Sequence, residues 1–372
     1  MAETGSSSRP HFPPHSESQV WLISSGDSPI GVSLTRQLLA HGDRVVSGLV
    51  PSDLLRDEKR RDYFHDFLDE VDRNSENGWK DRFRPVMLDI RYRKMGECQA
   101  AVAEAVETFG KLDILLCCTS QAVVGTVEEL AASERTIGLV RNQFETNYFG
   151  PVNVIKSALP RMRKQRAGHI LVLSGITAHI GTPGLGVYCA SEWALEGFCD
   201  SLAYEIAPFN IKVSILQCSM EIRILTNLIS SVPPILPAYS SKENNAPLFR
   251  NILDGLVSRL PQADVEAVSR THQDSSSASE QQGPFSSPEV VSMYPPLSAP
   301  HLEALTSETV HAITSIGGHE NPPSRHIIGQ EGVAAVKEKL KTVSEELEDF
   351  VQSSYSVNIV DSNDELHDEG VL

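Results

Sequence analysis

The sequence lacks any apolar run long enough to cross a bilayer, since no stretch approaches the roughly 18 continuous apolar residues that a spanning helix needs. Its first residues, MAETGSSSRPHFPPHSESQ, have neither a basic start nor an apolar segment, so we expect no secretory signal. Both absences favour a cytoplasmic protein with no membrane span.

Positive charge is also scarce. The chain has 32 Lys and Arg against 49 Asp and Glu, a net charge of −17, which argues against a nucleic-acid partner and against an anionic membrane surface. There are six cysteines and no Cys-x-x-Cys spacing, and the cysteines lie inside apolar segments. We therefore expect reduced thiols and no disulfide framework.

What the sequence does contain is a regular alternation of short apolar runs with longer amphipathic segments. Runs such as QVWLIS and HILVLSG are typical of strands that are buried on both faces, and the segments between them have helical spacing. The pattern predicts an α/β fold, a doubly wound parallel sheet covered by helices on both faces. Strands are expected at residues 19–24, 44–50, 85–90, 112–118, 169–175 and 211–218.

The stretch 51–84 is unusually charged, and we expect one amphipathic helix in it with a solvated polar face. The expected inner face comprises Leu55, Phe64, Phe67, Leu68 and Val71.

Composition also divides the chain. Between residues 231 and 300 it is rich in Pro, Ser, Asn and Gln, as expected for a disordered insertion, and helical periodicity returns after it. The expected organisation is a disordered tail at 1–18, the α/β domain at 19–230, the low-complexity insertion at 231–300, a C-terminal helical part of the same domain at 301–354 and an acidic tail at 355–372.

The segment Ser174–Glu192, SGITAHIGTPGLGVYCASE, is the first candidate for chemistry. A strand ends at Ser174, a Gly- and Pro-rich loop follows, and a helix opens near Tyr188. The spacing places Tyr188 and Glu192 one turn apart on the same helix face. A phenol beside such a loop is suited to proton transfer, whereas a carboxylate one turn behind it opposes formation of the phenolate.

A second candidate is the turn SSGDSPIG at residues 24–31, where the first strand runs into a helix. A turn of this kind can cradle a pyrophosphate at the helix N-terminus. With this turn, the run NQFETNYFGP and the Tyr188 helix in this order, residues 20–217 resemble the short-chain dehydrogenase/reductase family. The later PPSRHIIG and its helix resemble the C-terminal part of fungal-type members. The resemblance implies a Rossmann fold, NAD or NADP as cofactor and a homodimer.

The chain departs from the family's motifs at several positions. In the phosphate-binding motif Thr-Gly-x-x-x-Gly-x-Gly, Ser25 replaces the first glycine and Pro29 the second, and the third is kept. Pro29 adds a ring and removes an N–H where an anion would bind. Among the reacting residues Tyr188 is kept, but the family's Lys is replaced by Glu192 and its Ser by Gly175.

By resemblance, the catalytic candidates are Tyr188, Asn147 and Ser174, the last because it adjoins Gly175. Asn147 and Tyr188 also have ordinary structural uses, at a helix kink and a helix start. The cofactor contacts implied by the resemblance are Ser25, Ser28, Ile30, Gly31, Asp89, Cys117, Glu192 and Ser219. No metal site is predicted, although a thiolate site formed by Cys118, Cys189 and Cys218 stays open as an alternative.

Three hypotheses about function follow. The favoured one is a family member with impaired or absent dehydrogenase activity, acting as a nucleotide-sensing, binding or regulatory protein. The second is an active NAD(P)-dependent oxidoreductase acting on a small hydrophobic alcohol or ketone. The third is a scaffold that recruits a protein partner through residues 231–300.

Overall fold

The structure is a computed structural model, and it describes residues 11–15, 17–50, 54–55, 57–91, 95–218, 228–232 and 299–351. Most of the expected insertion, residues 1–10 and the expected acidic tail lie outside the described residues. The part of residues 1–18 that is described lies against the domain, because the ring of Phe12 stacks on His41 with 3.8 Å between centroids.

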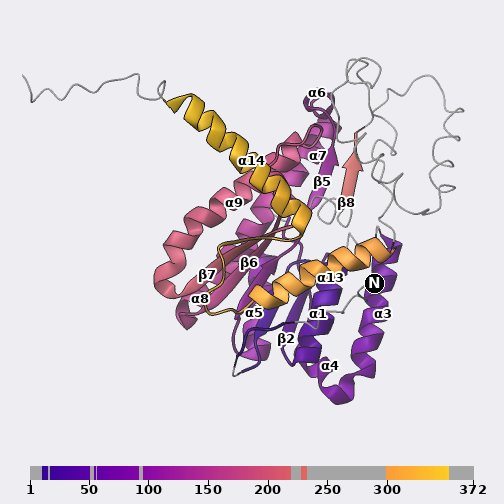
Figure 1. The fold of residues 1–372 in the computed structure, drawn as a ribbon. Coiled ribbons are helices and arrows are strands. Elements are labelled where there is room, and N and C mark those ends of the chain that lie inside the picture. Colours follow the sequence, from indigo (N-terminus) through magenta and orange to yellow (C-terminus); the bar gives the residue numbers. More distant parts are fainter. Residues whose placement is uncertain are drawn as a thin grey trace, which may run out of the picture.

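The centre of the molecule is a parallel sheet of seven strands in the order β3-β2-β1-β4-β6-β7-β9, with helices on both faces (Figure 1). The predicted doubly wound α/β fold is thus confirmed. The strands are β1 (Val20–Ile23), β2 (Arg44–Leu49), β3 (Phe83–Met87), β4 (Ile114–Cys117), β6 (Gly168–Gly175), β7 (Ile211–Cys218) and β9 (Arg325–Ile327).

Two apolar cores lie on the two faces of this sheet. Successive residues of a strand point to opposite faces, so Trp21 and Ile23 of β1 belong to one core and Val20 and Leu22 to the other. The first core is covered by α1 (Pro29–His41), α3 (Glu58–Arg73), α4 (Trp79–Arg82) and α13 (Ala299–Ile316), and the second by α5 (Gly96–Phe109), α8 (Gly150–Gln165) and α9 (Gly186–Ile206).

The remaining elements connect or extend these layers. The C-terminal helices that were predicted are present: α13 packs beside α1, and α14 continues from β9 (Figure 1). In the part of the chain that the structure describes, no helix is both long and apolar enough to span a bilayer. The remaining helices and helical turns are η1 (Ser75–Asn77), α6 (Val127–Leu130), α7 (Glu134–Phe144), η2 (Glu145–Phe149), η3 (Ile176–Ala178), η4 (Ala207–Phe209) and α14 (Gln330–Asp349).

The charged segment after β2 corrects one expectation. Phe64, Phe67 and Val71 of α3 are buried, as predicted. Leu55 is 78% exposed, so its predicted place on the inner face is wrong. The reason is local: Asp57 caps α3 by accepting the N–H of Arg60, so the helix begins after Leu55.

A small second sheet was not predicted. It pairs β5 (Gln121–Val124) with β8 (Leu228–Ser231) in parallel. Each strand has only four residues, and its partner lies about a hundred residues away, so local periodicity carries no signal for the pairing.

His169 ties the C-terminal segment to the sheet. It lies in β6 and is 3% exposed. The N–H of Gly318 donates to Nδ1 at 3.2 Å, so Nε2 carries the proton and faces Ser214 Oγ of β7 at 3.0 Å. Ser214 in turn donates to the carbonyl of Pro323. Burial, with a smaller effect of the Lys212 charge, lowers the pKa of His169 to about 3.

We therefore predict an acid sensitivity that depends on His169. In the unfolded chain a histidine takes up a proton near pH 6.5, whereas folded His169 does so only near pH 3. The folded state loses stability as pH falls below 6.5, by about 1.4 kcal/mol per pH unit. Between pH 7 and pH 5 the loss is about 2 kcal/mol, measurable by urea unfolding.

His169→Gln should remove this part of the pH dependence, whereas His65→Gln, a change at an exposed histidine of α3, should keep it. Equal slopes for His169→Gln and the unchanged protein would contradict the assignment.

Candidate active site

The turn between β1 and α1 lies at the carboxyl edge of the sheet and is closed by its own side chains. Ser24 Oγ accepts the N–H of Cys118 at 3.0 Å and contacts Thr119 Oγ1 at 2.9 Å, which joins the ends of β1 and β4. Gly26 packs on β2, where a Cβ would lie 1.8 Å from Ser47 Oγ. The close approach of Ser47 therefore favours a glycine at position 26.

The start of α1 uses its free donors internally. Ser28 caps the helix, with Gly31 N–H donating to Ser28 Oγ at 3.0 Å and Ser28 Oγ donating to the Ser25 carbonyl at 2.7 Å. Pro29, at the first helical position, has no N–H to offer. Ile30 follows and is buried. Two of the N–H donors that could meet a phosphate here are thus missing or already engaged.

A charge pair that the sequence reading missed covers the same turn. The carboxylate of Asp27 is fully buried, and Arg60 of α3 donates to it from Nε at 2.7 Å. Arg60 also donates from its second terminal nitrogen to Ser25 Oγ at 2.9 Å. The only sequence signal was the charged start of α3 after Asp57, which places Arg60 on the first helical turn.

These contacts test the fit of a nucleotide cofactor. A pyrophosphate would meet the buried Asp27 carboxylate, a proline without an N–H and the Gly31 N–H that already caps α1. Arg60 brings a cation to the turn, but it is paired with Asp27. As they lie, these residues do not fit a pyrophosphate.

The other expected cofactor positions are scattered. Asp89 forms a bidentate pair with Arg91, at 2.9 and 3.0 Å. Cys117, at the end of β4, faces the core under α5, α8 and α9, and burial raises its pKa well above the usual value. Ser219 lies outside the described residues.

The catalytic candidates do gather, at the ends of β6 and β7 and the start of α9. Tyr188 and Glu192 lie one turn apart on α9, as predicted, and both are fully buried, as is Ser174 at the end of β6. Glu192 Oε2 accepts the N–H of Gly175 at 3.0 Å and lies 2.9 Å from Ser174 Oγ. The residue in the family's Lys position therefore holds α9 to the end of β6.

A second carboxylate, missed in the sequence, shares the Ser174 hydroxyl. Glu196 lies one turn after Glu192 on α9, and its Oε1 is 2.8 Å from Ser174 Oγ. Gln217 of β7 donates from Nε2 to both oxygens of Glu196, at 2.8 and 2.9 Å. The i, i+4 spacing of the two glutamates on the helix was the available signal.

This polar network reaches the surface through β9. Arg325 donates to Glu196 Oε2 at 3.3 Å and to Asp200 Oδ2 at 2.7 Å. On the other side, Gln217 Nε2 lies 2.8 Å from His179 Nε2. Because an amide nitrogen has no lone pair to offer, His179 Nε2 is the acceptor. A continuous series of contacts thus links Glu196 to Arg325 and Asp200 on one side and, through Gln217, to His179 on the other.

The side chain of Asn147 forms its hydrogen bonds within the chain. The residue lies in η2, a π-helical turn between α7 and α8, which agrees with the structural use at a helix kink named above. Its side chain accepts the N–H of Gln121 at 3.0 Å and donates to the carbonyl of Gln121 at 2.9 Å and to Ser191 Oγ at 3.2 Å. Asn147 fastens β5 to α9 through these bonds.

The alternative of a thiolate site is contradicted. Cys118 and Cys218 pack into the core beneath α1, whereas Cys189 Sγ contacts the Ile180 carbonyl at 3.8 Å. Burial raises the pKa of Cys189, which disfavours the thiolate that a soft metal needs. In the structure these three cysteines do not form a metal-binding group.

Comparison with known proteins agrees with this arrangement of elements. An oxidoreductase, BOA17, from Botryotinia fuckeliana is 29% identical over 199 residues, which cover 54% of this chain and 64% of that protein. A 3-ketodihydrosphingosine reductase from Bacteroides thetaiotaomicron is 40% identical over 131 residues, 35% of this chain and 47% of that protein. Human retinol dehydrogenase 8 is 38% identical over 108 residues, 29% of this chain and 33% of that protein.

The chain thus spans between a third and two thirds of the length of these relatives. A crystal structure of a short-chain dehydrogenase from Streptomyces avermitilis has the same fold, with a TM-score of 0.64 and 22% identity, and the match covers 92% of this chain and 100% of that one. Residues 19–221 match the family described as short chain dehydrogenase. More than half of the sequence carries that match, and the chain therefore belongs to the short-chain dehydrogenase family.

Proposed function

We propose that this chain is a short-chain dehydrogenase whose dehydrogenase chemistry is absent or strongly impaired, and that it acts as a nucleotide-sensing, binding or regulatory protein. One observation carries the proposal. The Ser174 hydroxyl lies 2.9 Å from Glu192 and 2.8 Å from Glu196, and Glu192 stands where the family has its Lys. The hydroxyl is directed to carboxyl groups of its own chain.

The chemical reason concerns the phenol of Tyr188. In the family a neighbouring cation stabilises the phenolate, whereas a neighbouring carboxylate stabilises the neutral phenol. Glu192 is fully buried one turn from Tyr188, so solvent screens the carboxylate little. Losing general acid–base catalysis alone typically lowers a rate by about 10²–10⁴-fold.

Binding of NAD or NADP is proposed to be weak, and Arg60 is the residue that would govern it. The cofactor would supply hydride chemistry when bound, and its phosphates would have to compete with Asp27 for Arg60, whose Nε lies 2.7 Å from that carboxylate. The absence of an N–H at Pro29 leaves this cation as the main attraction for an anion at the turn.

The second candidate is an active oxidoreductase acting on a small hydrophobic alcohol or ketone. It is favoured by the names of two relatives, a retinol dehydrogenase and a 3-ketodihydrosphingosine reductase, whose named substrates are largely hydrocarbon. The recruitment of a protein partner through residues 231–300 stays a proposal, because most of that stretch lies outside the described residues.

A homodimer is the proposed assembly, by family membership. The dimer would form through α8 and α9. On α9, Trp193 is 55% exposed and Tyr204 is 85% exposed, and Phe149, which directly precedes α8, is 47% exposed. Aromatic side chains of this kind are enriched in protein interfaces.

The first prediction from the proposed function concerns the unchanged protein. Titration with NADH and with NADPH, followed by thermal shift and intrinsic fluorescence, should show weak binding, and no oxidation of the cofactor should follow with retinal or a long-chain ketone. Turnover of either carbonyl would support the oxidoreductase candidate instead. An absence of binding would remove the nucleotide from the proposal and leave partner recruitment to be tested.

The second prediction tests the carboxyl pair. Gly175 has φ −115° and ψ 157°, which a serine can adopt. Gly175→Ser combined with Glu192→Lys should restore the hydroxyl and the cation, and reductase activity should rise by about 10²-fold or more over the unchanged protein. Glu192→Gln with Gly175→Ser is the matched control without the cation, and it should stay inactive. Equal activity of both double variants would exclude the cation as the missing element.

The third prediction tests the phosphate turn. Asp27→Asn removes the buried negative charge and leaves Arg60 available, so the dissociation constant for NADPH should fall by about tenfold, or 1.4 kcal/mol. Arg60→Gln should weaken binding instead, by removing the cation. Isothermal titration of both variants decides the matter, and tighter binding by Arg60→Gln would show that Arg60 obstructs the turn.

A further inference from the structure

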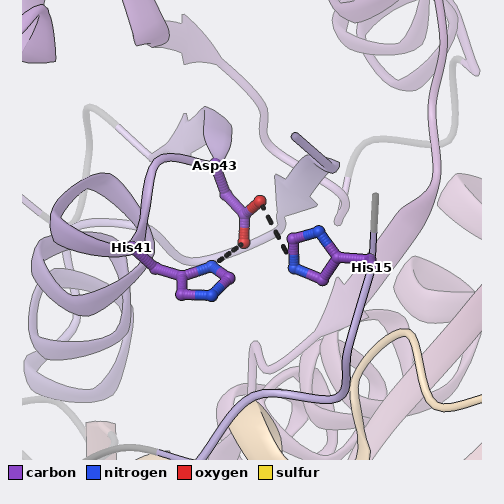
Figure 2. Close-up of side chains that lie close together, drawn as sticks. All are labelled: His15, His41 and Asp43. Carbon is purple, nitrogen blue, oxygen red and sulfur yellow. Dashed lines mark hydrogen bonds and ion pairs between the residues drawn. The ribbon is translucent and has the colours of Figure 1, made fainter. Parts of the chain in front are cut away.

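A cluster of two histidines and an aspartate lies apart from the active site, at the opposite edge of the sheet. His15 Nε2 is 3.9 Å from Asp43 Oδ1, and His41 Nδ1 is 3.2 Å from Asp43 Oδ2. Figure 2 shows both imidazole rings directed toward the one carboxylate, each from a different side. The three ligand atoms all lie within 4.8 Å of one another.

Two of these residues are fixed by the fold. His41 ends α1, and Gly42 closes the helix in the left-handed conformation with φ 106°. Asp43 follows directly before β2, its side chain is 1% exposed, and its Oδ1 also accepts the N–H of Gln19 at 2.9 Å. The carboxylate is therefore buried and anchored.

The third residue, His15, has a defined tautomer. Its Nδ1 lies 2.7 Å from the carbonyl of Glu17, which can only accept, so Nδ1 carries the proton. In the neutral ring Nε2 then presents a lone pair to the Asp43 carboxylate. Two acceptors facing each other leave room for a cation between them. A backbone carbonyl on the far nitrogen is also the arrangement that orients metal-binding histidines.

An aromatic ring supports the cluster. Phe12 stacks on His41 with 3.8 Å between ring centroids and 9° between planes, and His15 meets His41 edge-on at 4.9 Å. The stacking limits rotation of the His41 ring and keeps its Nδ1 toward Asp43. The segment before β1 thus brings both an apolar clamp and a ligand to the end of α1.

We propose that His15 Nε2, His41 Nδ1 and the Asp43 carboxylate bind one zinc ion, with water completing the coordination. Two imidazoles and one carboxylate suit zinc and similar first-row ions, whereas Mg²⁺ and Ca²⁺ prefer oxygen ligands alone. Ligand atoms at about 2.0–2.2 Å from a tetrahedral zinc ion lie about 3.4 Å apart. Closure therefore requires the ligand atoms, which lie within 4.8 Å of one another, to approach by up to about 1.4 Å, which the segment carrying His15 can supply without moving α1.

The site goes beyond the proposed function and does not depend on it. Helix α1 has 13 residues and is about 20 Å long, and it separates the cluster from the turn at Ser28. The ion would join the segment around His15 to the start of β2. Its role is structural, because it fastens the segment before β1 to the end of α1.

The test uses the full chain after removal of metals with EDTA. Titration with zinc chloride should show one ion bound per chain and a rise in melting temperature, and magnesium chloride should produce neither. X-ray absorption at the zinc edge should show nitrogen and oxygen ligands at about 2.0–2.2 Å. Sulfur ligands near about 2.3 Å would place the ion on cysteines and overturn the proposal. An absence of zinc binding would overturn it as well.

Variants assign the ligands. His15→Gln should weaken zinc binding at least tenfold, and hydrogen exchange of residues 11–19 should then no longer slow on addition of zinc. His65→Gln, at an exposed histidine of α3, is the matched control and should bind zinc as the unchanged protein does. His41→Gln provides a second reading should His15→Gln alter the segment itself. Unchanged zinc affinity in both ligand variants would overturn the proposal.

Discussion

Two buried carboxyl groups hold the carboxyl edge of this sheet together. Glu192 and Glu196 lie one turn apart on α9, and both reach Ser174 at the end of β6, at 2.9 and 2.8 Å. Burying a carboxylate costs several kcal/mol unless hydrogen bonds and opposite charges offset it. The Gly175 N–H, the Gln217 amide and Arg325 provide these partners. The position of β9 at the sheet edge matters here because it brings Arg325 to Glu196.

The phosphate turn repeats the same physical pattern. A buried carboxylate, Asp27, stands where an anion would have to bind, and Arg60 neutralises it from the neighbouring helix at 2.7 Å. Ser28 likewise uses the Gly31 N–H to cap α1 at 3.0 Å. In both places, several groups that could bind a ligand already form hydrogen bonds or ion pairs within the chain. This common pattern is the observation that supports the proposed loss of hydride-transfer activity.

How much of this arrangement the sequence predicted depends on how far apart along the chain the interacting residues lie. The main strands and helices and the shared face of Tyr188 and Glu192 depend on local periodicity, and they were predicted. The pairing of β5 with β8 depends on residues about a hundred positions apart. The contact of Arg60 with Asp27 depends on how the long arginine side chain reaches from α3 to the turn before α1. Neither relation has a periodic signal in one sequence.

Hydrogen-bond free energies indicate how strongly the two carboxyl groups hold the Ser174 hydroxyl. A substrate oxygen that took the Ser174 hydroxyl would gain a hydrogen bond worth about 0.5–1.5 kcal/mol net. The Ser174 hydroxyl would leave a fully buried carboxyl oxygen of Glu192, which would still accept the Gly175 N–H. A hydrogen bond to a charged group is worth about 1.5–3 kcal/mol, which exceeds the gain from a neutral substrate. The exchange is therefore unfavourable unless water or a cation enters with the substrate, and the bonds of the Ser174 hydroxyl hold α9 against the end of β6.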